Sequence, residues 1–317
     1  MDFFWIVFYK KILSSYDEIE RKRTMFYRQK VLLALIEAFG GTLKSRDLQK
    51  YLFLFTQKCQ QEKSYEFVPY KYGCFSFQSY ADRRNLTESG HLAKGDDWTL
   101  NESGYIKQLK KDDAQKIVLF KKYYEHLSGN SLIKEVYRDY PYYAINSEIA
   151  NRLMSKEEIE KIEEKRPCQA EPCFFTIGYE GQSFENYLNR LISNNIKLLC
   201  DVRRNPLSRK YGFSKSTLSD SLKKLGIEYV HIPELGIVSE KRQQLKTQSD
   251  YDRLFYEYEK TTLKENQDAL IKLCSLIDRH KRVAITCFEA DPCQCHRGRV
   301  AKKLVKMEDW EYPVEHI

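Results

Sequence analysis

Residues 174–202 read FFTIGYEGQSFENYLNRLISNNIKLLCDV, and this stretch decides the fold expected for the second half of the chain. It begins with an apolar run at 174–178, continues with an amphipathic pattern at 183–193, and ends in a second apolar run at 196–202. An apolar strand, a helix and another apolar strand form a unit in which the two strands lie parallel.

The same alternation continues to the end of the chain. The pattern predicts a helix over 214–225 with Ser214 as its N-cap, a strand over 229–232, a long helical region over 251–279, a strand over 282–288 and a last helix over 295–305. We therefore expect an α/β domain over 173–317 with a Rossmann-like, mostly parallel sheet and helices on both faces. In such sheets the functional groups gather at the carboxyl ends of the strands.

Polar and charged residues follow each of the four predicted strands, which makes this edge of the sheet the candidate site. Convergence of four segments on one edge is stronger evidence than any single residue. The candidates are Tyr179, Glu180, Asp201, Arg203, Arg204, His231, Cys287, Glu289, Cys295, His296 and Arg297.

Two carboxylates are the expected catalytic groups. Glu289 follows a buried strand, where burial and a nearby arginine shift a carboxyl pKa toward acid–base use, and Asp201 supplies the second carboxylate. Arg203, Arg204, His296 and Arg297 are expected to bind phosphate, since guanidinium groups bind it with two hydrogen bonds. The other candidates would contact the substrate, and Tyr179 would stack on a base. The structural alternative is that Arg203 pairs with Asp201 or Glu289 to stabilise the sheet edge.

The cysteines near residue 290 allow three interpretations. Cys295 at a helix N-terminus could be a nucleophile, or Cys287, Cys293, Cys295 and His296 could ligate zinc, although Cys-x5-Cys-x-Cys-His is not an ordinary zinc spacing. In the third interpretation the cysteines are core residues. We expect substrate binding by His296 and Arg297 without covalent cysteine chemistry, and neither a metal nor another cofactor.

Four motifs carry a resemblance to a known family: TIGYEG at 176–181, DVRRNPLSRKYGFSK at 201–215, GIEYVHIPELG at 226–236 and CFEADPCQCHR at 287–297. In this order, over about residues 174–305, they resemble the domain-of-unknown-function 488 family. The resemblance implies a compact Rossmann-like fold and leaves the reaction undefined. One departure is Phe288, where family members usually have alanine, and this ring would narrow a pocket beside Glu289.

The first half of the chain has a different pattern. We expect an extension over 1–24, a domain over 25–154 and a linker over 155–172, where a charged helical stretch runs into two prolines. Helical patterns at 29–39, 42–60 and 78–89 precede a predicted hairpin around 91–100, and the aromatic segment 65–77 is expected in the core. This is the order of a winged helix. Residues 26–150 also resemble winged-helix regulators and antitoxin-like domains through LTESGHL at 86–92 and LNESG at 100–104.

In a winged helix, one helix enters the major groove and the wing contacts the DNA backbone. This predicts Arg83, Arg84 and Lys94 as nucleic-acid contacts. A protein-docking role is the alternative for such a domain.

Composition excludes several classes of protein. With 42% hydrophobic residues the 317-residue chain is not predominantly disordered, and the longest apolar run, at 3–9, is too short to span a membrane. Nine cysteines, scattered and odd in number, argue against a disulfide framework and favour the cytoplasm. The net charge of +8 permits a polyanionic partner.

The combined expectation is a two-domain protein that processes a nucleotide or nucleic acid, with no membrane contact. The reaction would be hydrolytic, with cleavage of an N-glycosidic or phosphoester bond, and could serve defence against foreign DNA. The alternative is a DNA-binding regulator without catalytic activity, whose second domain senses an anionic small molecule.

Overall fold

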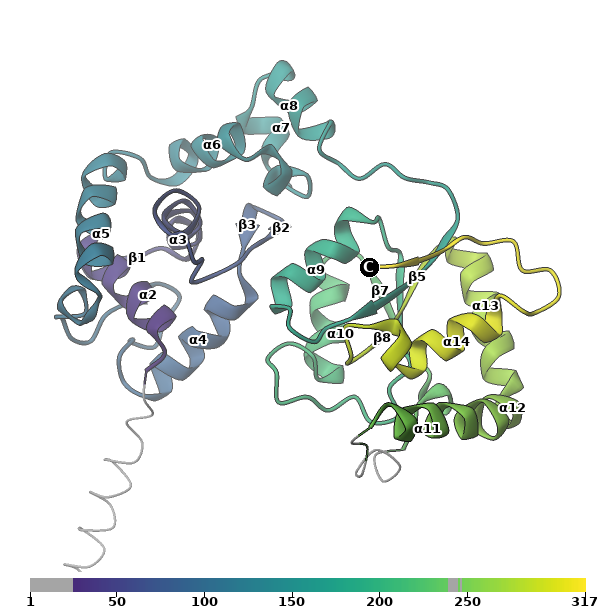
Figure 1. The fold of residues 1–317 in the computed structure, drawn as a ribbon. Helices are drawn as coiled ribbons and strands as arrows, with labels where there is room; N and C mark the ends of the chain where they lie inside the picture. Colours follow the sequence, from purple (N-terminus) through teal and green to yellow (C-terminus); the bar gives the residue numbers. More distant parts are fainter. Residues whose placement is uncertain (1–24, 239–244, 246) are drawn as a thin grey trace, which may run out of the picture. The chain divides into compact units, whose positions relative to one another are not determined.

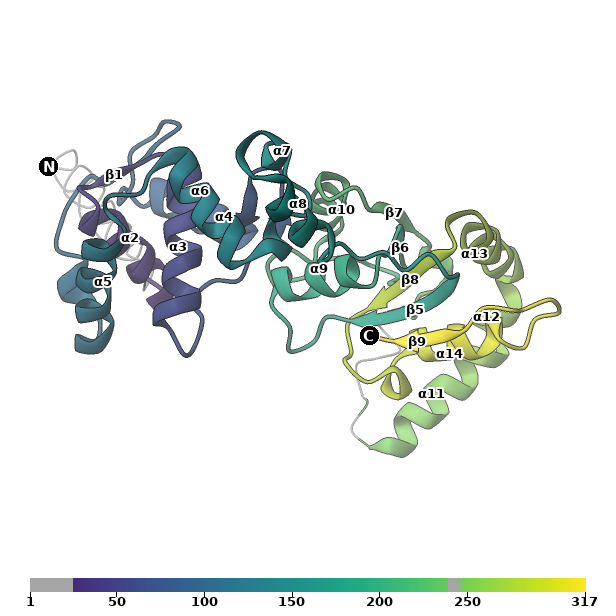
Figure 2. The ribbon, with the colours of Figure 1, turned by 90° about the horizontal axis from the view of Figure 1, so that it is seen from above.

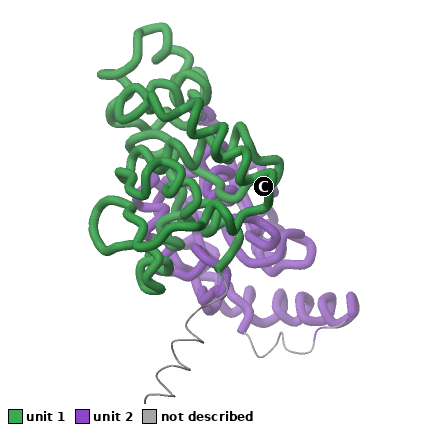
Figure 3. Tube along the Cα trace, turned by 90° about the vertical axis from the view of Figure 1, so that its left-hand side faces the viewer, with its two compact units in different colours: residues 1–165 green, residues 166–317 purple. Residues whose placement is uncertain are grey.

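The computed structural model describes residues 25–238, 245 and 247–317, so the expected extension over 1–24 lies outside the described residues. The chain divides into two compact units, which are residues 1–165 (unit 1) and 166–317 (unit 2; Figure 3). This division falls within the segment 155–172 that the sequence suggests as a linker. Within the described part of the chain, no helix is long and apolar enough to cross a membrane.

Unit 1 is mainly helical (Figure 1). Its helices are α2 (Tyr27–Ala38), α3 (Ser45–Cys59), α4 (Phe77–Glu88), α5 (Lys111–Tyr124), α6 (Gly129–Asp139), α7 (Ala150–Leu153) and α8 (Lys156–Glu163). Gly40 and Gly41 follow α2 with φ of 95° and 83°. This left-handed backbone costs glycine little, which explains why the helix stops there.

The short strands of unit 1 form two small antiparallel sheets. β1 (Thr42–Leu43) pairs with β4 (Trp98–Thr99), and β2 (Val68–Tyr70) pairs with β3 (Gly73–Phe75). The helix expected over 42–60 therefore begins only at Ser45, because the two residues before Lys44 pair with a segment far along the chain. Tyr65, Phe67 and Val68 are buried, as expected for the aromatic segment.

Unit 2 is built around one parallel sheet. Its strands are β5 (Cys173–Gly178), β6 (Leu198–Asp201), β7 (Glu228–His231), β8 (Arg282–Cys287) and β9 (Val314–His316). They lie in the order β7-β6-β8-β5-β9, and all four pairings are parallel (Figure 2). This confirms the Rossmann-like parallel sheet expected from the sequence and adds β9, which the sequence analysis did not predict.

Helices cover both faces of this sheet (Figure 1). They are α9 (Phe184–Ser193), α10 (Lys215–Lys224), α11 (Gln248–Lys260), α12 (Thr262–Glu265), α13 (Gln267–His280) and α14 (His296–Leu304). On one face, α11, α13 and α14 pack against alternate residues of the strands, among them Leu198, Cys200, Val283 and Ile285. On the other face, α9 reaches β8 through the Tyr187 hydroxyl, which donates to Thr286 Oγ1 at 2.9 Å.

The strand order creates a topological switch point between β6 and β8. From the end of β6 the chain runs outward to β7 at one edge of the sheet, whereas from the end of β8 it runs to β9 at the other edge. In open α/β sheets, diverging connections of this kind border a crevice at the strand ends. Ligands of open α/β sheets bind in such crevices.

Candidate functional site

The strand register brings the predicted site segments to one edge of the sheet. Asp201 at the end of β6 lies opposite His231 of β7 and Thr286 of β8. Gly178 at the end of β5 lies opposite Cys287. The loops that follow these strands therefore start side by side, with the switch point between β6 and β8 at their centre.

Asp201 and Arg203 form a buried ion pair at this edge. Arg203 Nε donates to Asp201 Oδ1 at 2.8 Å, and a terminal guanidinium nitrogen donates to Oδ2 at 2.5 Å. The carboxylate also accepts bonds from the Arg203 backbone N–H and, at 2.8 Å, from the Tyr229 hydroxyl. Burial alone lowers the pKa of Arg203, but the hydrogen bonds with Asp201 outweigh it and raise this pKa above its ordinary value.

This geometry favours the structural alternative for both residues. The Asp201 carboxylate is fully buried and accepts four hydrogen bonds from protein groups. Neither of its oxygens is therefore available for proton transfer with a substrate. The remaining guanidinium nitrogen of Arg203 donates to the Tyr179 hydroxyl and to the Phe213 carbonyl. The structure thus does not favour Asp201 as an acid–base group, nor Arg203 as a phosphate ligand.

Tyr179 is part of the core beneath the site. Its ring stacks on Phe213 with centroids 4.2 Å apart and an interplanar angle of 9°, and the Arg203 guanidinium lies over the ring as well. The side chain is buried. Its faces are therefore occupied by protein groups, and the predicted stacking on a base is not favoured.

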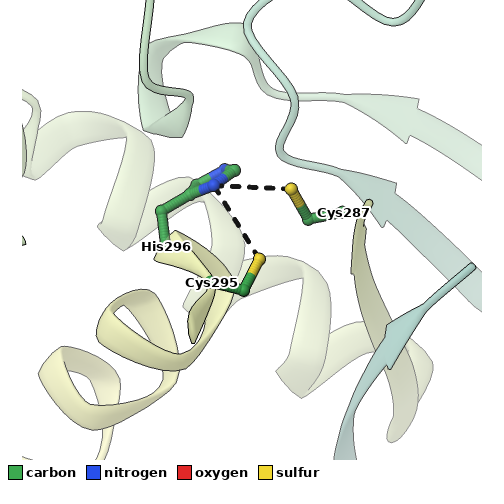
Figure 4. Close-up of side chains that lie close together, drawn as sticks. All are labelled: Cys287, Cys295 and His296. Carbon is green, nitrogen blue, oxygen red and sulfur yellow. Dashed lines mark hydrogen bonds between the residues drawn. The ribbon is translucent and has the colours of Figure 1, made fainter. Parts of the chain in front are cut away.

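Cys287, Cys295 and His296 form a buried cluster, which we call the Cys–Cys–His cluster (Figure 4). Cys287 ends β8, while Cys295 and His296 begin α14. The His296 Nδ1 atom lies 3.4 Å from Cys287 Sγ and 4.0 Å from Cys295 Sγ. The other ring nitrogen, Nε2, lies 2.9 Å from the Val202 carbonyl oxygen and donates to it.

The electrostatics of the cluster argue against a cysteine nucleophile. Burial raises the pKa of the Cys295 thiol well above its ordinary value, and the Cys287 thiol and the Glu289 charge raise it further. A protonated thiol is a weak nucleophile. The absence of covalent cysteine chemistry stays a prediction, and the raised pKa of Cys295 is consistent with it.

Glu289 lies next to this cluster. Its side chain is partly exposed, and Oε2 is 3.4 Å from Cys287 Sγ. The backbone on either side is held firmly, because the Phe288 carbonyl accepts from the N–H groups of Tyr179 and Glu180. Glu289 is thus a carboxylate on a fixed backbone, with a polar sulfur on one side and access to solvent.

Arg297 and Glu180 hold the loop that carries Glu289. The Arg297 guanidinium donates to the backbone carbonyls of Glu289 and Ala290, and its side chain is only 1% exposed. Glu180 accepts the Ala290 N–H at 3.0 Å. Both residues act on the backbone, so the predicted phosphate contact of Arg297 is not favoured.

Arg204 and His231 lie on the side of β7. Arg204 is exposed and lines a cavity of about 270 Å³ together with Glu234, Tyr258 and Asn266. His231 is partly exposed and contacts the Arg203 carbonyl through Nε2 at 2.9 Å and Lys215 Nζ through Nδ1 at 3.2 Å. Among the predicted phosphate ligands, Arg204 keeps a cationic group facing solvent.

Sequence reasoning missed two aromatic residues at this site, Tyr229 and Tyr258, and named a third, Phe288, only as a departure from the family pattern. Phe288 is 43% exposed beside Glu289, and its ring meets Tyr179 edge-on. The Tyr229 hydroxyl donates a hydrogen bond to Asp201 Oδ2. The Tyr258 and His296 rings lie edge to face, with centroids 5.9 Å apart. The departure of Phe288 from the family pattern was the signal in the sequence for this position.

The nucleic-acid contacts predicted in unit 1 differ in accessibility. The Arg83 guanidinium donates to the carbonyls of Gly95, Asp96 and Asp97 and lies over the Trp98 ring, so it holds the hairpin. Arg84 and Lys94 are exposed.

Unit 2 is thus a parallel α/β domain with a buried cluster of two cysteines and a histidine at the carboxyl end of β8. Residues 183–304 match the family model described as Domain of unknown function DUF488. The match lies within the region where the sequence motifs resemble this family. No curated protein matches the chain, and no solved structure matches it either.

Proposed function

We propose that unit 2 is a hydrolase that acts on a nucleotide or a nucleic acid, with Glu289 as its acid–base residue. The observation that carries the proposal is the position of Glu289. It follows β8 at the switch point, is partly exposed, and lies on a backbone held by Arg297 and Glu180. A carboxylate that is both fixed in position and accessible to solvent is suited to general acid–base catalysis.

Two exposed groups on the loops after the strands support a substrate with a base and a phosphate. The exposed Phe288 ring offers a surface on which a nucleobase can stack. Arg204 offers an exposed guanidinium at the cavity beside β7, and a guanidinium suits phosphate.

The proposed reaction is attack by water on an N-glycosidic or a phosphoester bond. Glu289 accepts a proton from the water molecule while the oxygen of that water forms a bond to the sugar carbon or to phosphorus. The bond to the base or to the leaving oxygen breaks, and the leaving group takes up a proton.

A substrate panel tests this proposal. The full chain is incubated with nucleotides, single-stranded DNA and RNA and duplex DNA, and products are identified by mass spectrometry. Glu289→Gln is expected to lower kcat at least about 100-fold, the usual contribution of an acid–base residue. The control Glu308→Gln changes an exposed glutamate on the chain after α14 and leaves kcat unchanged. Full turnover by Glu289→Gln would refute the assignment.

We also propose that unit 1 is a winged-helix domain that binds nucleic acid. Support comes from the hairpin after α4, in which Leu92 bridges Leu100 and β4 pairs with β1. A helix followed by a hairpin that pairs with an earlier strand is the order found in winged helices. Arg84 on α4 and Lys94 on the hairpin are the proposed phosphate contacts.

Binding to a labelled DNA duplex at several salt concentrations tests the role of unit 1. The double substitution Arg84→Ala and Lys94→Ala is expected to weaken binding and to lower the salt slope by about 1 for each lost phosphate contact. Arg152→Ala, which removes an exposed arginine of α7, serves as the control. If duplex binding occurs while the substrate panel shows no turnover, the protein is the non-catalytic regulator.

A further inference from the structure

We propose that Cys287, Cys295 and His296 bind a zinc ion. Their ligand atoms, two Sγ and one Nδ1, all lie within 4.8 Å of one another and are buried (Figure 4). The three residues come from two elements, the end of β8 and the start of α14, which the fold brings together. This site goes beyond the proposed hydrolase function and does not depend on it.

The distances fit a tetrahedral zinc site. With Zn–S near 2.3 Å and Zn–N near 2.0–2.1 Å, a sulfur and a nitrogen ligand lie about 3.6 Å apart. The two distances from His296 Nδ1 to the sulfurs are 3.4 and 4.0 Å, one on each side of this value. An ion between the three atoms therefore requires only small movements of the side chains.

The orientation of His296 supports the same conclusion. A backbone carbonyl can only accept, so the bond between Nε2 and the Val202 oxygen places the ring proton on Nε2. Nδ1 then carries a lone pair that faces both sulfurs. Metal-bound histidines are typically oriented in this way, with the second ring nitrogen donating to a carbonyl or a carboxylate.

Glu289 lies beside one of the three proposed ligands, Cys287. Its Oε2 atom is 3.4 Å from Cys287 Sγ, which is close to the separation expected for neighbouring groups around zinc. Cys293, which the sequence analysis included among possible ligands, is exposed and lies outside the cluster.

The ligand set selects the metal. Two thiolates and an imidazole suit zinc, whereas oxygen-binding cations such as magnesium and calcium avoid sulfur ligands. On binding, the Cys287 and Cys295 thiols each release one proton to solvent, and His296 binds as the neutral imidazole. No oxidant or reductant is required.

The first test is the metal content of the full chain. The reduced protein is stripped with a chelator, reloaded with zinc, freed of excess metal and analysed by mass spectrometry. One zinc per chain is expected. Cys287→Ser, Cys295→Ser and His296→Asn should each retain less than about a tenth of this amount. The matched control Cys293→Ser, in the same loop, should retain all of it, and equal loss in Cys293→Ser would refute the site.

Cobalt provides a second test that needs no substitution. Cobalt bound by the two thiolates should give an intense near-ultraviolet charge-transfer band and the visible bands of a tetrahedral ion. Wild-type protein that lacks these bands, or that retains no zinc, would overturn the proposal even if the cysteine variants fail to fold. Glu289→Gln should keep its zinc while it loses turnover, so the failure of one proposal can be told from the failure of the other.

Discussion

The carboxylate of Asp201 faces the guanidinium of Arg203 two residues along the chain, and the two form a two-point ion pair at 2.8 and 2.5 Å that is closed to solvent. The pair lies at the end of β6, the strand that borders the switch point. It stabilises the edge of the sheet on which the site is built.

Removal of one partner should therefore destabilise unit 2 strongly. Asp201→Asn is expected to lower the free energy of unfolding by about 3–5 kcal/mol, because Arg203 then stays buried without its counter-charge. Denaturant-induced unfolding of the full chain, followed by circular dichroism, measures the change. As a control, Arg253→Met breaks an exposed pair with Asp250 and should change stability by less than about 1 kcal/mol. If Asp201→Asn keeps its stability and loses turnover, Asp201 is catalytic after all.

Phe288 should contribute to ligand affinity. Stacking on an aromatic side chain contributes about 1–3 kcal/mol per base, so Phe288→Ala is expected to weaken nucleotide binding by roughly 5- to 150-fold, while Phe288→Tyr retains it. Isothermal titration calorimetry measures the affinity. Tyr256→Ala removes another exposed aromatic ring, on α11, and should have no effect. Unchanged binding by Phe288→Ala would rule out stacking on this ring.

Gly178 sets the position of the Glu289 backbone. A Cβ atom at residue 178 would lie 1.9 Å from the Glu289 carbonyl oxygen, so the backbone of one segment must move. Gly178→Ala is expected to cost about 1–3 kcal/mol of stability, as overpacking does. Hydrogen–deuterium exchange should become faster in peptides that cover 288–297.

Gly236→Ala is the comparison for this substitution. There the added Cβ would lie 2.2 Å from the Arg204 backbone nitrogen, so peptides around residue 204 should respond first. Unchanged exchange at 288–297 in Gly178→Ala would show that this loop is not fixed by close contact with β5.

Lys50 should make the stability of unit 1 depend on pH. Its side chain is 2% exposed, and burial lowers its pKa from the ordinary value of 10.5. Between the lowered folded value and 10.5 the unfolded chain binds more protons than the folded chain. This residue therefore makes the free energy of unfolding rise with pH across that window.

Comparison with Lys50→Met isolates this contribution. The variant removes the buried charge and should be more stable than the wild type near neutral pH, with a difference that shrinks as the pH rises toward 10.5. Denaturant-induced unfolding at several pH values below 10.5 measures both curves. A constant difference between them would show that Lys50 does not titrate in this range.

The local pattern was sufficient for many elements of unit 2. The helix expected over 183–193 is observed at Phe184–Ser193, and its N-cap, Ser183, accepts the Asn186 N–H at 3.1 Å. The strand expected over 282–288 is observed at Arg282–Cys287. Such elements are specified by side-chain periodicity and by hydrogen bonds within a few residues, and both can be recognised in a single sequence.

Long-range pairing was not accessible in the same way. The three residues of β9 carry no strand pattern of their own, and they form a strand because β5 offers them an open edge. Lys50 lies on α3, and the apolar positions of this helix were recognised from the sequence. The segment around Cys74 comes from elsewhere in the chain, accepts a hydrogen bond from Lys50 Nζ, and buries this side chain as well. Burial of one face depends on what packs against it, and that comes from elsewhere in the chain.

The sequence by itself determined that four strands would deliver polar groups to one edge of a parallel sheet, because strand direction and strand ends follow from the local pattern. Only the tertiary structure decided which of those groups bind one another and which bind the backbone. Asp201 pairs with Arg203, Arg297 binds backbone carbonyls, and Cys287 meets His296 across a gap of nine residues. Hydrogen bonds and ion pairs depend on distances of a few ångströms between side chains. Those distances are set by the strand order and register of the folded sheet.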